Sequence, residues 1–328
     1  MKLKLGSAGA GHLLAVFCIL AWAATFIVNK LLFNDDFNPL AVILLRKTLA
    51  LLLMSVTCAV QAGFRWPKQA RGSLKQRLRR DWRLIAAGLI GIFIYYLLDN
   101  YSVKHTFATN ASLLMTISPI FTALISRYIA KETQRFGFSF ILGSLCCFFG
   151  AAMIIFNGSF VLRLSPLGDM LAIGAALLWA VYSSLIKRIS TENAAREHPR
   201  SEVQIARDIL FWGCLGIWIF YLASGNGFAD LAHYTGKQWG MIAYLGVGAS
   251  YICLLFWNGS IARIGAVKCS LYMFATPLLV ILASAVFLEE RLRLVSGLGA
   301  VALLLGLALA QGLLDKRLHR QEPAHANG

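Results

Sequence analysis

Aromatic and polar side chains recur at helical spacing inside two of the most apolar stretches of the chain. Trp22 and Thr25 lie three residues apart in the first stretch, and Trp179 and Tyr182 lie three apart in the second. Residues three or four apart share one face of a helix, and broad ring faces pack apolar groups and attract cations. We interpret the two patches as facing walls of a ligand cavity. Tryptophans of an interfacial aromatic belt are the alternative.

Further residues inside apolar stretches carry hydroxyl, amide, thioether or phenol groups that could contact the same ligand. A polar side chain that faces lipid is left unpaired, so these groups should face protein or water. The alternative for the two asparagines is that they pin helix ends. These further candidates are Tyr95, Asn100, Ser112, Met115, Tyr251, Asn258, Ser270 and Met273.

Three ionisable groups lie deep within apolar stretches: Arg46, Lys47 and Asp99. A charge in a membrane is costly and is a functional candidate by default. Arg46 could attract a ligand carboxylate, and Asp99 could carry a coupling proton. The alternatives are that Lys47 snorkels to the interface and that Asp99 lies close enough to a helix end to be hydrated.

Prolines and charged pairs recur in two further stretches. Pro119 and Pro277 lie within them, and a proline inside a helix removes one backbone hydrogen bond and bends the helix. The bend could open a cavity or a gate, or serve packing alone. Two acid–base pairs follow: Glu132 with Arg135, and Glu290 with Arg293. They could close alternately as gates, although exposed pairs contribute only about 0–1 kcal/mol and interfacial anchoring is the alternative.

Catalytic and metal-binding patterns are not found in this sequence. It has no G-x-S-x-G, no H-E-x-x-H and no C-x-x-C, and its six histidines lie at the ends of apolar stretches, between them or in the tail. We therefore predict no enzyme activity, no cofactor and no metal site. We read the seven cysteines, which lie in or at the edges of apolar stretches, as small packing residues.

The composition requires a membrane protein. Hydrophobic residues make up 58% of the 328 residues and charged residues 14%, and a spanning helix needs about 20 mostly apolar residues. The net charge of +16 would suggest nucleic acid in a soluble chain, but the basic residues lie between the apolar stretches. We predict an all-α integral membrane protein with ten spans, at 11–33, 38–61, 83–103, 106–129, 136–157, 168–187, 208–224, 238–260, 266–287 and 294–314.

Two halves of the chain carry one pattern. Asn100, Ser112, Leu113, Met115, Pro119, Glu132 and Arg135 recur 158 residues later as Asn258, Ser270, Leu271, Met273, Pro277, Glu290 and Arg293. Each copy has five predicted helices, an odd number, so the second copy enters the membrane upside down. We predict inverted-topology repeats at 1–157 and 158–315 and a polar tail at 316–328, an organisation typical of transporters with a midplane site.

Lysine and arginine counts predict the orientation. With a cytoplasmic N-terminus, inside segments hold 23 of the 31 basic residues and outside connections hold five. Both termini are then cytoplasmic, in a cell (inner) membrane. The N-terminal apolar run resembles a signal peptide, but its pattern recurs in mid-chain, so we read it as the first span. In the basic segment 65–83, Leu74, Leu78 and Trp82 would share a helix face, which suggests an in-plane helix on anionic lipid or a solvated loop.

The segment Trp257–Ala266, followed by Thr276-Pro277 and Phe287–Leu292, resembles the second EamA-type domain of the drug/metabolite transporter superfamily, and Asn100–Glu132 resembles the first. The resemblance implies ten helices in two inverted repeats. It also implies export or exchange of amino acids, related metabolites, nucleotide-linked compounds or drugs, with Trp22 and Trp179 at cavity-lining positions.

From these observations we predict a small-molecule transporter, an exporter of amino acids or related metabolites that works by alternating access as a monomer or homodimer. A drug or quaternary-cation exporter of the same fold is the alternative, and a channel or an intramembrane enzyme is a remote one. Its partners would be the small-molecule substrate and the lipid bilayer, without nucleic acid.

Overall fold

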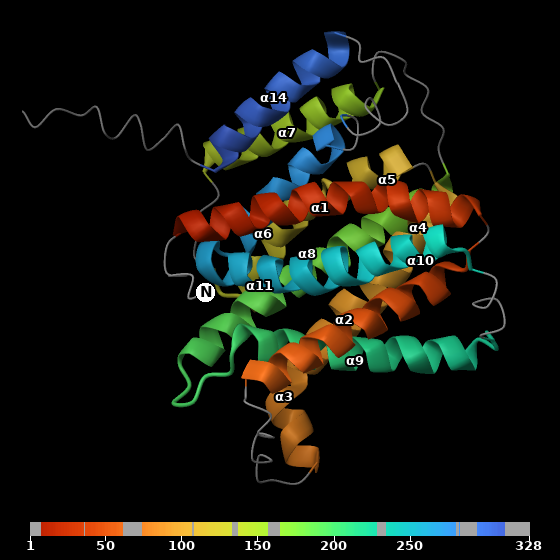
Figure 1. The fold of residues 1–328 in the computed structure, drawn as a ribbon. Helices are drawn as coiled ribbons and strands as arrows, with labels where there is room; N and C mark the ends of the chain where they lie inside the picture. Colours follow the sequence, from red (N-terminus) through yellow and green to blue (C-terminus); the bar gives the residue numbers. More distant parts are fainter. Residues whose placement is uncertain are drawn as a thin grey trace, which may run out of the picture.

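The computed structural model describes residues 8–35, 37–61, 74–106, 108–132, 137–156, 165–227, 234–279, 282 and 294–311. Within this part of the chain the regular structure is entirely helical (Figure 1). Eight helices are long and apolar enough to cross a membrane, and two shorter apolar helices cover Ala266–Leu279 and Leu294–Ala310. The predicted all-α membrane fold is confirmed, and these ten helices follow the order of the ten predicted spans.

The first half of the chain folds into seven α-helical segments. They are α1 (Ala8–Asn34), α2 (Pro39–Gln61), α3 (Leu74–Gly88), α4 (Tyr95–His105), α5 (Ala108–Met115), α6 (Ser118–Ile129) and α7 (Phe138–Phe156). A π-helical segment, Leu89–Ile94, joins α3 to α4. The third span therefore runs from Leu78 to His105, which is longer than predicted.

The second half has the same plan. Its helices are α8 (Pro166–Ala194), α9 (Glu202–Ala223), α10 (Gly236–Ala243), α11 (Cys253–Ile264), α12 (Ala266–Ser270) and α14 (Leu294–Ala310). A π-helical segment, Tyr244–Ile252, joins α10 to α11, and a 3-10 segment, Leu271–Ala275, follows α12.

The predicted end of the sixth span at 187 and the predicted start of the seventh at 208 are wrong. Helix α8 continues to Ala194 and α9 begins at Glu202, so only seven residues connect them. Helix α8 gains the i,i+4 ion pair between Arg188 and Glu192 at 2.6 Å. A capping box between Ser201 and Gln204 starts α9. Polar residues thus extend both helices beyond the lengths that hydropathy predicts.

Both proline-containing helices are irregular before their prolines. In the fourth span α5 ends at Met115 and α6 begins at Ser118, with Pro119 in its first turn. In the ninth, 3-10 geometry occupies the five residues before Thr276. A proline lacks the N–H that an α-helix needs and its ring clashes with the preceding turn, so the predicted interruption occurs in both copies.

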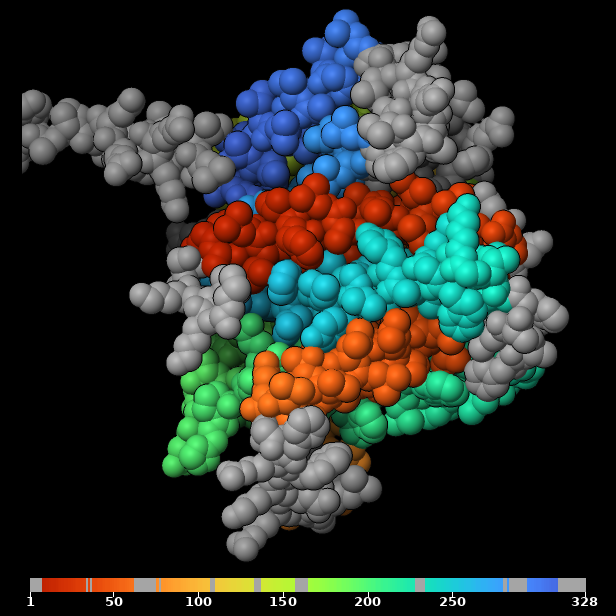
Figure 2. Space-filling model, in the orientation of Figure 1, coloured from red at the N-terminus to blue at the C-terminus, as the bar shows by residue number. Residues whose placement is uncertain are grey.

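The packing of the helices follows the symmetry of the repeats. The first helix of one repeat lies along the third helix of the other: α1 packs on α11, and α8 packs on α4. The second helices, α2 and α9, pack on each other, as do the fifth helices, α7 and α14. Figure 2 shows α1 lying between α14 and α11 on one face of the molecule.

Glycines bring α7 and α14 into backbone contact. A Cβ at Gly150 would lie 2.6 Å from the carbonyl oxygen of Gly299, and one at Gly306 would lie 2.7 Å from the backbone nitrogen of Cys147. Small residues permit this close approach, which is a common basis of helix association in lipid. The α7–α14 pair forms a separate layer beside the main bundle (Figure 1), so the site lies among the other helices.

Candidate functional site

A cavity that is partly open to solvent lies between the two repeats. Eight predicted residues line it: Trp22, Thr25, Arg46, Tyr95, Asp99, Met115, Trp179 and Met273. Phe26, Tyr96 and Thr276 complete the lining. The wall therefore combines aromatic rings and methionines with one guanidinium and one carboxylate. An apolar cleft with a few convergent polar groups is the usual form of a small-molecule site.

Trp22 and Trp179 meet in this wall. Their ring centroids are 5.4 Å apart at 83°, an edge-to-face arrangement. Trp257 lies against both, at 4.9 Å from the Trp22 ring and 5.9 Å from the Trp179 ring. Because Trp257 is 0% exposed and Trp179 1% exposed, the three indoles form a closed layer, which we call the tryptophan layer.

The π-helical segment before α11 helps to hold Trp22. The indole Nε1 of Trp22 donates to the carbonyl oxygen of Ala249 at 3.0 Å, and the hydroxyl of Tyr244 donates to the carbonyl of Ala21. Both Ala249 and Tyr244 belong to the π segment. Single π turns occur frequently at functional sites, and here the segment fixes an aromatic ring of the cavity wall.

Arg46 brings a cation to the cavity from the first half of α2. Its Nε donates to Ser250 Oγ at 3.1 Å, and its Cζ lies 5.1 Å from the centroid of the Tyr96 ring. Arg46 is only 2% exposed. An arginine that is fixed by one hydrogen bond and one ring keeps other N–H groups available for a carboxylate.

Lys47 is fully buried, with 0% exposure, and its Nζ lies 3.2 Å from the centroid of the Tyr96 ring. The predicted alternative that Lys47 snorkels to the interface is therefore wrong. Its ammonium has no hydrogen-bond partner among the described residues. The cation–π contact with Tyr96 replaces part of the lost hydration.

Asp99 is the carboxylate of the cavity wall. It is half-buried in the last two turns of α4 and forms no ion pair within 4.0 Å of another described residue. Arg46 is the other charged residue of this wall. The guanidinium of Arg46 and the carboxylate of Asp99 thus both line the cavity, and they do not form an ion pair with each other.

The remaining predicted residues do not line this cavity. Asn100 Oδ1 accepts from Asn29 Nδ2 at 3.1 Å, and Asn258 Oδ1 accepts from the Tyr182 hydroxyl at 2.8 Å. The asparagines thus join the first and third helices of each repeat, which favours the structural alternative for them. Tyr251 pairs with Thr57, and Ser112 and Ser270 are buried in the helix packing.

Sequence reasoning missed Trp257, Phe26 and Thr276 as members of the site. Phe26 is one residue beyond the predicted Thr25. Thr276 directly precedes Pro277 in the repeated pattern, so its position was available as a signal. Trp257 occupies the position equivalent to Asp99, 158 residues later. Trp257 bounds the cavity because the end of the bundle on its other side is closed in this structure, and no sequence pattern indicates which end is closed.

The cavity lies in the half of the bundle where α1 ends and α2 begins. Thr25 and Phe26 belong to the second half of α1, Arg46 belongs to the first half of α2, and Asp99 lies near the end of α4. The tryptophan layer separates the cavity from the opposite end of the bundle.

Contacts between segments distant in sequence close that opposite end. Ser260 Oγ donates to the carbonyl oxygen of Gly11 at 2.8 Å, and Arg263 pairs with Glu202 at 3.0 Å. Glu132 reaches across from the first repeat, where its Oε1 accepts from the backbone N–H of Ala266 at 3.1 Å. Glu132 thus caps the first turn of α12.

The predicted pairing of Glu132 with Arg135 stays a prediction, because Arg135 lies outside the described residues. Glu290 and Arg293 lie outside them as well, so the second predicted gate is also untested. Pro119 and Pro277 lie within the described residues, at the two helix interruptions.

Comparisons with known proteins agree with this architecture. The model of the EamA-like transporter family matches residues 9–156 and again residues 166–311. The chain is 27% identical over 248 residues to "Uncharacterized transporter YyaM" of Bacillus subtilis (strain 168), covering 74% of this chain and 77% of that one.

Two further similarities concern a curated relative and a solved structure. The chain is 26% identical over 276 residues to a "Probable terminal-alkyne amino-acid exporter" of Streptantibioticus cattleyicolor, covering 84% of each chain. A crystal structure superposes with a TM-score of 0.73 at 17% identity, over 95% of this chain and 100% of that chain. This second similarity concerns the fold alone. With both of its halves matched by the family model, this chain belongs to the EamA-like transporter family.

Proposed function

We propose that this transporter exports amino acids or related metabolites and that its substrate binds in the cavity bounded by the tryptophan layer. The substrate class that suits the wall is a zwitterion with an apolar side chain. Arg46 would receive the carboxylate, Asp99 would receive the ammonium group, and the rings of Trp22 and Tyr95 would pack the side chain.

The observation that carries this proposal is the presence of an arginine and an unpaired aspartate in one aromatic cavity. A ligand with a single charge would leave one of these groups without a partner in a poorly hydrated site, which costs about 1–3 kcal/mol or more. A zwitterion satisfies both groups. The name of the Streptantibioticus cattleyicolor relative, an amino-acid exporter, supports the same class.

Export of drugs or quaternary cations is the second candidate. Asp99 and the indole faces favour a cation, whereas the guanidinium of Arg46 in the same wall repels one. A ligand that carries a carboxylate as well as a cation therefore matches this wall better than a simple cation does.

We further propose alternating access between the two repeats. With cytoplasmic termini, as the lysine and arginine bias predicts, the cavity lies in the extracellular half and the contacts of Glu132, Ser260 and Arg263 close the cytoplasmic half. Movement of one repeat against the other would break these contacts and open the cavity to the cytoplasm. Both repeats belong to one chain, so a monomer is sufficient for this cycle.

Counterflow in proteoliposomes tests the proposal. Vesicles preloaded with unlabelled compound are offered labelled amino acids, organic cations or sugars, and we expect accumulation of apolar or aromatic amino acids. The double variant Trp22→Ala plus Trp179→Ala should abolish accumulation, since both ring faces are lost. Trp239→Ala, which truncates a tryptophan that is 42% exposed on α10, serves as the matched control and should retain wild-type counterflow.

Accumulation of quaternary cations instead of amino acids would replace the first candidate with the second. Amino-acid counterflow that survives in the double variant would refute the proposed cavity while leaving the substrate class intact.

A further inference from the structure

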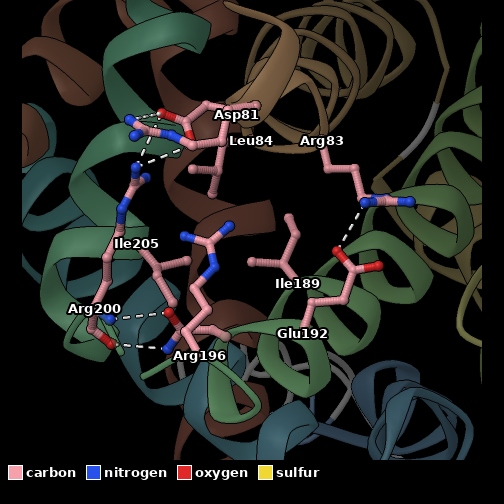
Figure 3. A pocket seen from close by; sticks show the side chains of 10 residues that line it. Asp81, Arg83, Leu84, Ile189, Glu192, Arg196, Arg200 and Ile205 are labelled. Carbon is pink, nitrogen blue, oxygen red and sulfur yellow. Dashed lines mark hydrogen bonds and ion pairs between the residues drawn. The ribbon is translucent and has the colours of Figure 1, made fainter. Parts of the chain in front are cut away.

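A second hollow lies outside the transport cavity, among the middle of α3, the C-terminal part of α8, the connection from α8 to α9 and the start of α9 (Figure 3). It is partly open to solvent. Four arginines line it together with two acids: Arg80, Arg83, Arg196 and Arg200, with Asp81 and Glu192. Nothing in the proposed transport cycle uses this cluster.

The acids around the hollow are shared between arginines. Arg200 pairs with Asp81 at 2.9 Å and with Asp208 at 3.1 Å. Glu192 pairs with Arg83 at 2.7 Å and with Arg188 at 2.6 Å. With Arg80 on Asp81 and Arg207 on Asp208, three carboxylates pair with five arginines. Positive charge therefore exceeds negative charge in this network.

Arg196 holds part of this excess. It is exposed in the connection between α8 and α9; its backbone N–H donates to the carbonyl oxygen of Asn193, and its side chain makes no hydrogen bond or ion pair with another described residue. Figure 3 shows its guanidinium group directed into the hollow, between Arg200 and Ile189. Among the described residues, the Arg80 side chain pairs with its neighbour Asp81 alone, at 3.3 Å, and 45% of it is exposed. Two guanidinium groups are thus available for an anion.

An apolar groove continues from the hollow. The two spaces share Asp81, Leu84 and Arg200 in their walls. Beyond these shared residues, the groove is lined by Asp208, which is paired with Arg200, and by four apolar side chains from α3 and α9: Leu78, Ile85, Phe211 and Trp212. An anion site that opens into an apolar groove is complementary to a molecule with a phosphate at one end and a hydrocarbon chain at the other.

Both spaces lie at the level expected for lipid headgroups. Trp82, next to Asp81, is 51% exposed, and the Arg83 guanidinium lies 4.8 Å from the centroid of its ring. Exposed tryptophan and arginine residues at the end of a spanning helix mark the membrane interface. The same end of the bundle carries most of the basic residues, which predicts the cytoplasmic leaflet, where anionic lipids are found.

We propose that this region is a binding site for one anionic phospholipid. Its phosphate would bind Arg196 and Arg80, and one acyl chain would lie in the groove of Leu78 and Phe211. A lipid bound there would join α3, α8 and α9, and hence the third span of the first repeat to the first two spans of the second. This inference stands independently of the transported substrate.

Native mass spectrometry of the purified full-length protein tests the proposal. The probes are dioleoyl-phosphatidylglycerol, dioleoyl-phosphatidylcholine, dihexanoyl-phosphatidylglycerol and inorganic phosphate. We expect one saturable dioleoyl-phosphatidylglycerol adduct, at least about ten-fold (about 1.4 kcal/mol) tighter than the phosphatidylcholine adduct. Both headgroups carry the phosphate, but the quaternary ammonium of phosphatidylcholine cancels its charge and is repelled by the four arginines of the hollow. Arg196→Gln should weaken that adduct by a similar factor, and Leu78→Asn should weaken the long-chain lipid more than the short-chain one.

Arg127→Gln is the matched control, since Arg127 is an exposed arginine near the end of α6 and should leave the affinity unchanged. Variants that unfold are identified by a changed charge-state distribution; Arg80→Gln then tests the same anion site. Equal binding of both dioleoyl lipids, or equal affinity in the Arg196 and Arg127 variants, would overturn the proposal. Binding of inorganic phosphate as tight as that of the lipid would overturn it in favour of a soluble anion.

Discussion

The third helix of the first repeat and the third helix of the second have nearly the same backbone and opposite roles. Both contain a π-helical segment, and Leu89–Ile94 shifted by 158 residues falls within Tyr244–Ile252. Both carry a buried asparagine at the same position, Asn100 and Asn258, bonded to a side chain of the first helix of its repeat. The duplication has preserved this frame.

The side chains on the frame differ where it meets the interior. Tyr95, Tyr96 and Asp99 of the first repeat line the cavity. The equivalent positions of the second repeat hold Cys253, Leu254 and Trp257, which are all at most 1% exposed. The first repeat therefore places the carboxylate of Asp99 in the cavity wall, and the second repeat places the indole of Trp257 in the buried tryptophan layer.

This difference indicates why two repeats with similar backbones form one ligand cavity rather than two. Symmetry of the backbone allows both ends of the bundle to close against similar helices. Asymmetry of the side chains decides at which end a polar ligand is held and at which end packing dominates. Exchanging or trimming the residues that differ should therefore have large and unequal effects.

The largest effect is expected from placing the first repeat's residue in the second, as Trp257→Asp. The change removes a fully buried indole, which costs about 3–5 kcal/mol, and buries an unpaired carboxylate, which adds several kcal/mol more. We expect little folded protein, measured by size-exclusion chromatography after detergent extraction. Asp99→Asn, at the equivalent position, should elute as the wild type does. Normal elution of Trp257→Asp would contradict the closed tryptophan layer.

A smaller effect is expected at the turn after α11, where Glu132 holds the backbone N–H of Ala266. Glu132→Ala leaves that donor unsatisfied, at a cost of about 1–3 kcal/mol, and should open this end more often. Labelling of the buried Cys269 by N-ethylmaleimide, mapped by peptide mass spectrometry, should accelerate at least about five-fold.

Two comparisons control this experiment. Glu132→Gln keeps an acceptor oxygen and should change the rate less, and Cys214, buried on α9, should react at an unchanged rate. Equal acceleration at Cys214 would indicate general loosening rather than the opening of one end.

The smallest effect separates two tryptophans of the same layer. Trp22 Nε1 donates to Ala249, whereas Trp257 Nε1 is buried with no partner among the described residues. Trp22→Phe should lower stability by about 1 kcal/mol more than Trp257→Phe, because only the first loses a hydrogen bond and the second also removes an unsatisfied donor. Thermal unfolding in one detergent measures the difference. A larger loss for Trp257→Phe would contradict this assignment.

Hydropathy and repetition were enough to predict the helical membrane fold, because bilayer thickness fixes the length of a spanning helix. They missed the true ends of α8 and α9, since the Arg188–Glu192 pair and the Ser201 capping box extend these helices into water. Hydropathy places the predicted end of a helix at its first polar turns, although the helix itself continues.

The site was predicted in part. Trp22 and Trp179 meet because residues on one helical stripe share a face. Tyr95 and Tyr96 both line the cavity, although adjacent residues of a regular α-helix point in different directions. The π segment directly before them alters the register, and no spacing rule based on 3.6 residues per turn anticipates that.

We propose that Arg46 binds the carboxylate and Asp99 the ammonium group of one zwitterionic substrate. The direct measurement is equilibrium binding to purified protein of an amino acid, its decarboxylated amine and its deaminated acid, in wild type, Arg46→Gln and Asp99→Asn. We expect the wild type to bind the amino acid more tightly than the amine or the acid. Arg46→Gln should lower the affinity for the amino acid about ten-fold or more and change the affinity for the amine little. Asp99→Asn should lower the affinity for the amino acid by a similar factor and change the affinity for the acid little. Equal losses for all three ligands in both variants would contradict it.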